Sequence, residues 1–188
     1  MLGNPQRDYM DLLHCETRDE VMQRVREWSS DLSEEDHLIR STILEIHLNV
    51  ENRLKLLFYH TLLPLVWEGD DKDEVERYRA SLLKTVNRLN FSTVHRLLKP
   101  CFDAYPADEL GNLQMINDVR NQTAHGNAES VVYKARNPFR DEDCLAQLFF
   151  DAWAANKVLG DFLTKMVLDP RALAERYYEL YCESLQHT

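Results

Sequence analysis

Apolar side chains recur at intervals of three and four residues over two long stretches, and this spacing constrains the fold most strongly. The first stretch follows Ser33 and is expected to run to about Leu63, with Pro64 ending it. The second runs from about Asp141 to Leu168. Such spacing places the repeated positions on one face of an α-helix. The positions are Ile39, Ile43, His47, Val50, Leu54, Leu57 and Phe58 in the first stretch, and Leu145, Leu148, Phe149, Ala152, Val158, Leu159, Phe162 and Met166 in the second.

Shorter helical segments have recognisable starts and stops. Thr17 and Glu20 have the spacing of a capping box, which predicts that a short helix begins there. A segment from about Glu74 to Lys99 is expected to stop at Pro100. It can break in two at residues 90–93, because polar side chains there compete for backbone hydrogen bonds.

Two more helices complete the predicted architecture. One is expected from about Ala107 to a left-handed cap at Gly126, and the last has Asp169 as its cap and Pro170 at its first position. The content of 5 Gly and 6 Pro leaves little material for a turn-rich all-β fold. We therefore predict an all-α protein, a helix bundle. Its expected parts are an N-terminal segment with a short helix (1–33), the bundle (34–168) and a C-terminal helix packing on the bundle (169–188).

Composition limits the location and the class of partner. No apolar run approaches the ~20 residues that cross a bilayer, and the first residues lack the apolar core of a signal peptide. A soluble, cytoplasmic protein without a membrane partner is expected. The net charge of −10 argues against a general nucleic-acid coat, which is normally basic. The four cysteines form no cluster of the kind that holds zinc, so neither a metal nor a cofactor is predicted.

Residues 117–126 (NDVRNQTAHG) contain the most specific functional signal. Arg120 carries a permanent charge in a fork that suits a phosphate, and His125 can move protons near neutral pH. Together these side chains can hold and cut a phosphodiester without a metal. Five positions on an ideal helix correspond to about 140° of rotation and ~7.5 Å of rise, so the two do not share a face. Either the last turn unwinds, or a symmetric dimer supplies a second copy of each residue.

This stretch resembles the Arg-Asn-x-x-x-His motif of HEPN domains (higher eukaryotes and prokaryotes nucleotide-binding), many of which are ribonucleases. Asn121 follows the arginine, and Ala124, His125 and Gly126 match the usual end of the motif. The resemblance covers roughly residues 34–168, and only the motif is specific. It implies a HEPN-like antiparallel bundle of four to five helices, with the motif towards the end of a late helix.

The resemblance also implies a mechanism, in which two motifs face each other across a homodimer. Arg120 would hold the scissile phosphate of an RNA substrate, and Asn121 would orient the site. His125 would act as general acid or base, and the cut would leave a 2′,3′-cyclic phosphate and a 5′-hydroxyl end. An acid on an early helix would position the arginine. Glu51 is the first candidate for this supporting role, and Glu45 is the second.

These features predict a metal-independent endoribonuclease of the toxin or defence type, with an antitoxin as a possible partner. Alternatives remain open, because His125 could simply cap its helix and Arg120 could pair with Asp118 or Glu51. The mannitol operon repressor family has a similar helix order and an Arg-Asn-x-x-Ala-His stretch, yet is described as a regulator. The main alternative is therefore a non-catalytic HEPN-fold regulator or a partner of a nucleotidyltransferase. A plain helical scaffold is the third.

Two further features have both a functional and a structural interpretation. Lys84, Arg88, Arg96 and Lys99, together with Arg77, are the main cations of the 74–99 segment. They predict a strip that binds RNA in a salt-dependent way, although an ordinary solvated helix face has the same composition. His47 lies on the apolar face of the first long stretch, where a core histidine with a hydrogen-bond partner is expected rather than a metal ligand.

Overall fold

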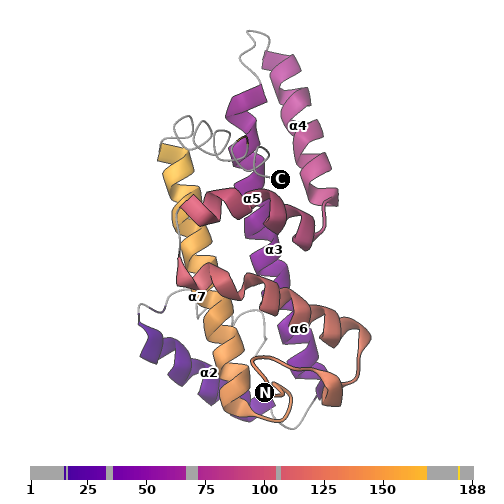
Figure 1. The fold of residues 1–188 in the computed structure, drawn as a ribbon, viewed down its shortest axis with the longest axis vertical. Helices are drawn as coiled ribbons and strands as arrows, with labels where there is room; N and C mark the ends of the chain where they lie inside the picture. Colours follow the sequence, from indigo (N-terminus) through magenta and orange to yellow (C-terminus); the bar gives the residue numbers. More distant parts are fainter. Residues whose placement is uncertain are drawn as a thin grey trace. The chain divides into compact units, whose positions relative to one another are not determined.

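The computed structural model describes residues 15, 17–32, 36–66, 72–104, 107–168 and 182. These residues contain six α-helices and two short 3-10 helices (Figure 1). They contain no β-strand, only an isolated bridge between Tyr133 and Arg136. The all-α class is therefore confirmed for the described residues. The elements are α2 (Arg18–Leu32), α3 (Asp36–Val66), α4 (Lys72–Arg88), α5 (Phe91–Ala104), η1 (Asp108–Asn112), α6 (Leu113–His125), η2 (Ala128–Ser130) and α7 (Glu142–Leu168).

The chain divides into two compact units. The first unit comprises residues 1–50 and 111–157, and the second comprises residues 51–110 and 158–188. The two long helices α3 and α7 each contribute one part to each unit. The motif helix α6 belongs to the first unit, which therefore contains Arg120, Asn121 and His125.

In the first unit, α3 and α6 run antiparallel. Arg40, near the start of α3, donates a hydrogen bond to the carbonyl of Thr123 near the end of α6. His47, further along α3, is 3.1 Å from the side-chain oxygen of Asn117, which lies earlier in α6. The order of contacts reverses between the helices, as in an antiparallel pair. His47 is buried and hydrogen-bonded, which confirms its prediction as a core histidine.

The helices α2 and α7 also pack antiparallel in the first unit. Arg18 lies over the Phe150 ring, 5.1 Å from its centroid, whereas Arg26 forms an ion pair of 3.3 Å with Asp143. The earlier residue of α2 thus meets the later residue of α7. Between these elements lies a core of fully or nearly fully buried apolar side chains. Its members include Val21, Val25, Ile39, Ile43, Ile46, Leu113, Ile116, Val119, Leu145 and Phe149.

The second unit combines α4 and α5 with the remaining parts of α3 and α7. Lys55 of α3 donates to the carbonyl of Asn87 on α4 at 3.2 Å. Phe102 of α5 packs against Phe162 of α7 with 6.3 Å between ring centroids. The predicted apolar faces therefore point into helix–helix contacts in this unit too. Its buried residues include Leu54, Leu57, Phe58, Val86, Val94, Leu98 and Leu159.

One predicted helix start and one predicted break between helices are confirmed by their hydrogen bonds. At the first, the Glu20 amide donates to the Thr17 hydroxyl at 3.2 Å, and the Thr17 amide donates to the Glu20 carboxylate at 3.4 Å. At the second, the Thr93 amide donates to the side chain of Asn90 at 2.9 Å. Asn90 thus caps α5 and separates it from α4, where the sequence predicted a possible break.

The two prolines predicted to end helices do not do so. α3 passes through Pro64 to Val66, and α5 passes through Pro100 to Ala104. Proline removes the amide hydrogen bond to the carbonyl four residues earlier, and its ring crowds that carbonyl, so each helix continues past its proline at a cost. In α5, burial continues beyond the proline, because Cys101 and Phe102 lie in the core.

Some predictions fall outside the described residues. These include the helix start at Ser33 and, apart from Cys182, the C-terminal helix over 169–188. Within the part that the structure describes, no helix is both long and apolar enough to cross a membrane.

Candidate functional site

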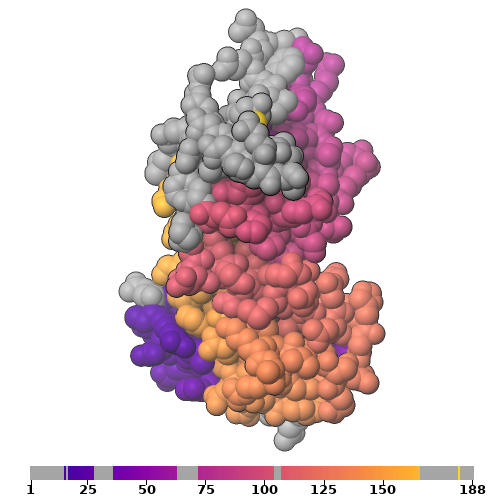
Figure 2. Space-filling view, viewed as in Figure 1, coloured from indigo at the N-terminus to yellow at the C-terminus, as the bar shows by residue number. Residues whose placement is uncertain are grey.

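The motif residues lie on a surface helix of the first unit. One face of α6 is buried, and the residues between its core positions face outward. Arg120 is half-buried, whereas Asn121 and His125 are exposed. In the space-filling view, the orange surface of α6 and the segment that follows it is open on one face of this unit (Figure 2). The buried residues of α6 are Leu113, Ile116, Asn117, Val119 and Thr123.

The guanidinium of Arg120 has no carboxylate partner among the described residues. Its Nη1 donates to the side-chain oxygen of Asn121 at 3.0 Å. Asp118, a predicted alternative partner, instead accepts a hydrogen bond of 2.8 Å from Gln114. The chain has 32 acidic residues against 22 Lys and Arg, yet no described carboxylate forms an ion pair with Arg120. Its charge remains available to an anion, and Asn121 restricts the orientation of its fork.

His125 is the last residue of α6 and projects into solvent. It forms no hydrogen bond or ion pair with any described residue. The helix is regular as far as His125, so the last turn is not unwound in a way that would bring the imidazole beside Arg120. About 140° of rotation therefore separates the two side chains within one protomer. Of the two arrangements considered from the sequence, the unwound last turn is therefore not observed.

Gly126 ends the motif helix, but not as predicted. Its φ of −103° and ψ of −178° are extended, so the expected left-handed cap is wrong. Its amide donates to the carbonyl of Gln122 at 2.7 Å. A Cβ at this position would lie 2.7 Å from that same oxygen and 3.0 Å from the hydroxyl of Ser130. Glycine is therefore required here by close approach and not by a positive φ.

Two side chains of α3 fix the motif helix, and the sequence pointed to only one of them. His47 meets Asn117, three residues before Arg120. Arg40, which was not predicted, donates to the carbonyls of Thr123 and Gly126. The sequence could have indicated this contact, because Arg40 precedes the core residue His47 by seven positions, or about two helical turns. The two residues therefore lie on a similar side of the helix.

The two predicted supporting acids lie in different units. Glu51 belongs to the second unit, where its carboxylate pairs with Lys55 at 2.8 Å. Glu45 belongs to the first unit and is half-buried. Among the described residues of this unit, no hydrogen bond or ion pair joins Glu45 to Arg120.

Three cations form a line on α4. Arg77, Lys84 and Arg88 are all exposed, and their spacing places them within about 20° of one line along the helix. None of the three has an ion pair in the described part of the chain. Their charges therefore face solvent, and none forms an ion pair with a described carboxylate.

The two predicted cations of α5 differ from each other. Arg96 is exposed and forms no ion pair with a described residue. Lys99 pairs with Asp103 one turn later, with 2.8 Å between the charged atoms. Among the described residues of the second unit, Lys84, Arg88 and Arg96 are thus exposed and form no ion pair, whereas Lys99 is exposed and paired.

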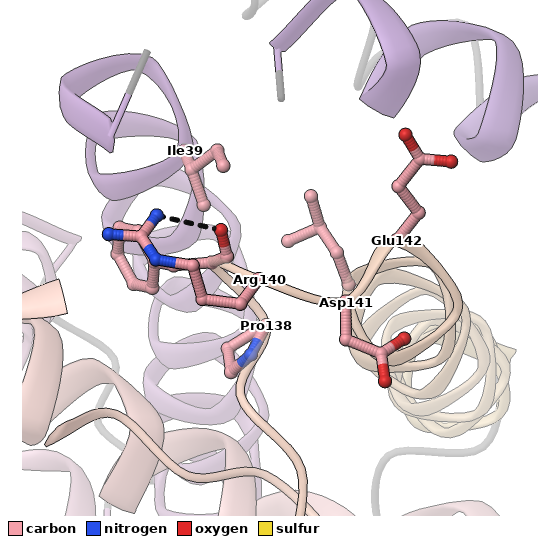
Figure 3. Close-up of a pocket in the computed structure, with 7 residues that line it drawn as sticks. Ile39, Pro138, Arg140, Asp141 and Glu142 are labelled. Carbon is pink, nitrogen blue, oxygen red and sulfur yellow. Dashed lines mark hydrogen bonds between the residues drawn. The ribbon is translucent and has the colours of Figure 1, made fainter. Parts of the chain in front are cut away.

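A pocket of about 240 Å³ lies elsewhere in the first unit, between the start of α3 and the loop before α7 (Figure 3). At its rim, Arg140 donates to the carbonyl of Phe139 at 3.0 Å and pairs with Asp36 at 2.6 Å and with Glu129 at 2.7 Å. The hydrogen bond from Arg140 lowers the pKa of Asp36 below its ordinary value of 3.8. The charge of Arg140 is thus already matched. The lining residues are Ile39, Pro138, Phe139, Arg140, Asp141, Glu142 and Leu145, and none belongs to the motif.

No group of three or more His, Cys, Asp or Glu side chains that could hold a metal occurs among the described residues. Comparison with known proteins adds no relative: no protein-family model, curated protein or solved structure matches this chain. Any functional assignment therefore depends on the chemistry of the residues themselves.

Proposed function

We propose that this protein is a HEPN-like endoribonuclease that cuts RNA without a metal and acts as a homodimer. One observation carries the proposal: Arg120 has no acid partner among the described residues and is oriented by Asn121 on the surface of an acidic protein. A guanidinium that is not engaged by a carboxylate can bind a phosphate through two parallel hydrogen bonds.

The chemistry is an internal transfer of a phosphodiester. The ribose 2′-oxygen forms a bond to the adjacent phosphorus, and the bond from phosphorus to the 5′-oxygen breaks. Arg120 stabilises the negative charge that builds on the phosphate oxygens. His125 accepts the 2′-hydroxyl proton or protonates the departing 5′-oxygen, and water exchanges the other proton. The products are a 2′,3′-cyclic phosphate and a 5′-hydroxyl end.

The helix geometry supports a dimer as the active form. Arg120 and His125 lie on different faces of a regular helix, so one protomer does not align them on a single phosphate. A two-fold axis beside α6 would place the arginine of one copy near the histidine of the other, since such an axis repeats the same surface on both partners. The site is then composite, and each dimer contains two equivalent sites.

The cation line on α4 supports RNA as the substrate class. Arg77, Lys84 and Arg88 can contact successive phosphates of a single strand, with Arg96 adding a fourth unpaired cation on α5. Each contact releases a counterion and changes the slope of log K against log [salt] by about −0.7. Replacing Lys84 and Arg88 with Gln should reduce that slope by roughly 1.4. Lys99→Gln should change it less, because Lys99 already pairs with Asp103.

The direct experiment uses purified protein and an end-labelled RNA in excess EDTA. Fragments ending in a 2′,3′-cyclic phosphate are expected. Arg120→Ala and His125→Ala should each lower the rate by roughly 10²-fold or more, with circular dichroism unchanged. Arg24→Ala and His37→Ala remove exposed residues of the same types from the first unit and should leave the rate unaltered.

Failure to cut any RNA, or wild-type rates in both motif variants, would overturn the proposal. In that case the second candidate gains, a non-catalytic HEPN-fold regulator. The separation of Arg120 and His125 on the helix is the observation that favours it. Such a protein should still retain a partner during purification and should cause no growth arrest when expressed.

A further inference from the structure

The C-terminal end of the motif helix is held by an arginine from another helix. Arg40 lies on α3, half-buried, with its guanidinium directed at the last turn of α6. Its Nη1 donates to the carbonyl of Thr123, and its Nη2 donates to the carbonyl of Gly126 at 3.2 Å. The two accepting residues lie on either side of His125 in the sequence. The backbone that carries the imidazole is therefore anchored on both sides.

These contacts satisfy groups that a helix leaves open. The last four carbonyls of an α-helix have no donor within the helix. Here the Gly126 amide satisfies the carbonyl of Gln122, and Arg40 satisfies that of Thr123. A cation at this end also interacts favourably with the negative end of the helix dipole. The arginine thus stabilises the last turn through directed hydrogen bonds and through its charge.

The guanidinium is itself held in place. Its carbon lies 5.9 Å from the centroid of the Phe139 ring, a cation–π distance. Lysine at the same position would supply one ammonium and could not match the planar fork that reaches two carbonyls. Lysine could therefore supply the positive charge that balances the helix dipole, but only arginine can form both hydrogen bonds.

We propose that Arg40 is a positioning residue, which fixes the angle at which His125 leaves the motif helix. This inference rests on the proposed function, because a fixed angle matters only if His125 must meet the reacting atoms. Arg40 itself does not touch the RNA. Small misplacements of an acid or base are costly, so loosening the last turn should slow the chemical step more than it weakens binding.

The test compares Arg40→Met, Arg40→Lys and a matched control, Arg26→Met. The control removes an arginine of the same unit whose ion pair with Asp143 joins α2 to α7. In Arg40→Met, hydrogen exchange of the Gly126 amide should accelerate about tenfold relative to amides in the middle of α7. At a temperature where all variants remain folded, kcat should fall about tenfold with KM changed less than about twofold. For both the exchange rate at Gly126 and kcat, Arg40→Lys should lie between Arg40→Met and the wild type, and Arg26→Met should match the wild type.

A double variant separates positioning from general stabilisation. If Arg40 acts through His125, Arg40→Met has nothing left to misplace once the imidazole is gone. It should then lower the residual rate of His125→Ala by less than about twofold, which is strong coupling in a double-mutant cycle. An equal tenfold loss in both backgrounds would overturn the inference, and so would unchanged exchange at Gly126. If the wild-type protein cuts no RNA, the proposed function fails. The exchange measurement then still decides whether Arg40 holds the last turn.

Discussion

The buried hydrogen bond between Tyr133 and Asp151, which follows the motif helix in the sequence, allows the size of a stability change to be predicted. The Tyr133 hydroxyl donates to Asp151, whose carboxylate also accepts from Lys134 at 2.7 Å and from Gln147 at 3.0 Å. Tyr133→Phe removes the hydroxyl and keeps the buried ring. A hydrogen bond to a charged group contributes about 1.5–3 kcal/mol. Because the carboxylate keeps two donors, we expect a loss of about 2 kcal/mol in the free energy of unfolding.

Chemical denaturation measures this loss, and thermal denaturation should show a fall in Tm of roughly 4–8 °C for a chain of this size. Tyr59→Phe is the matched control, since the Tyr59 hydroxyl forms no hydrogen bond with any described residue. Its effect should stay within about 0.5 kcal/mol. If Tyr133→Phe is as mild as the control, the assignment of a strong buried hydrogen bond to Asp151 is wrong.

The same pair predicts a dependence on alkaline pH. Burial, and then the hydrogen bond to Asp151, raise the pKa of Tyr133 far above its ordinary value of 10. The unfolded chain loses this proton near pH 10 while the folded chain keeps it. The contribution of the Tyr133 hydroxyl to the free energy of unfolding is therefore complete below pH 10. Above pH 10 this contribution declines by about 1.4 kcal/mol per pH unit. The difference between wild type and Tyr133→Phe should narrow over that range, and a constant difference would contradict this assignment.

Two glycine-related predictions concern the backbone around the motif. Ala135 has a φ of 66°, in the left-handed region, so Ala135→Gly should raise the free energy of unfolding by roughly 1 kcal/mol. The control, Ala80→Gly on the exposed face of α4, should lower the free energy of unfolding by about as much. Urea denaturation distinguishes the two signs, and a lower free energy of unfolding for Ala135→Gly would refute the reasoning. Gly126→Ala should cost about 1–3 kcal/mol because its Cβ would collide with the carbonyl of Gln122, but Gly111→Ala, with open space around it, should cost nothing measurable. Equal effects of the two alanines would show that close approach does not explain Gly126.

The features predictable from the sequence are those set within a few residues. The Thr17–Glu20 capping box and the Asn90 cap each join residues three positions apart, so their spacing is visible in the chain. The apolar faces of α3 and α7 follow from the same helical period. Even the angle between Arg120 and His125 followed from the helix rise and rotation alone.

The features that could not be predicted depend on distant partners. Arg40 and Gly126 are 86 positions apart, so no local pattern joins them. The continuation of α5 through Pro100 depends on core contacts that offset the lost backbone bond. That no described acid pairs with Arg120 depends on how each nearby carboxylate is used, as the hydrogen bond from Gln114 to Asp118 illustrates. In each case tertiary packing decides between choices that the local sequence leaves open.

Mixing two inactive variants tests the composite site most directly. Arg120→Ala and His125→Ala subunits are purified separately, allowed to exchange in equal amounts, and assayed on RNA. A mixed dimer keeps one site in which an intact arginine faces an intact histidine. Random assortment makes half of the dimers mixed, so the rate should recover to about a quarter of the wild-type value. No recovery beyond the separate variants, with mixed dimers verified by mass, would contradict a site shared between subunits.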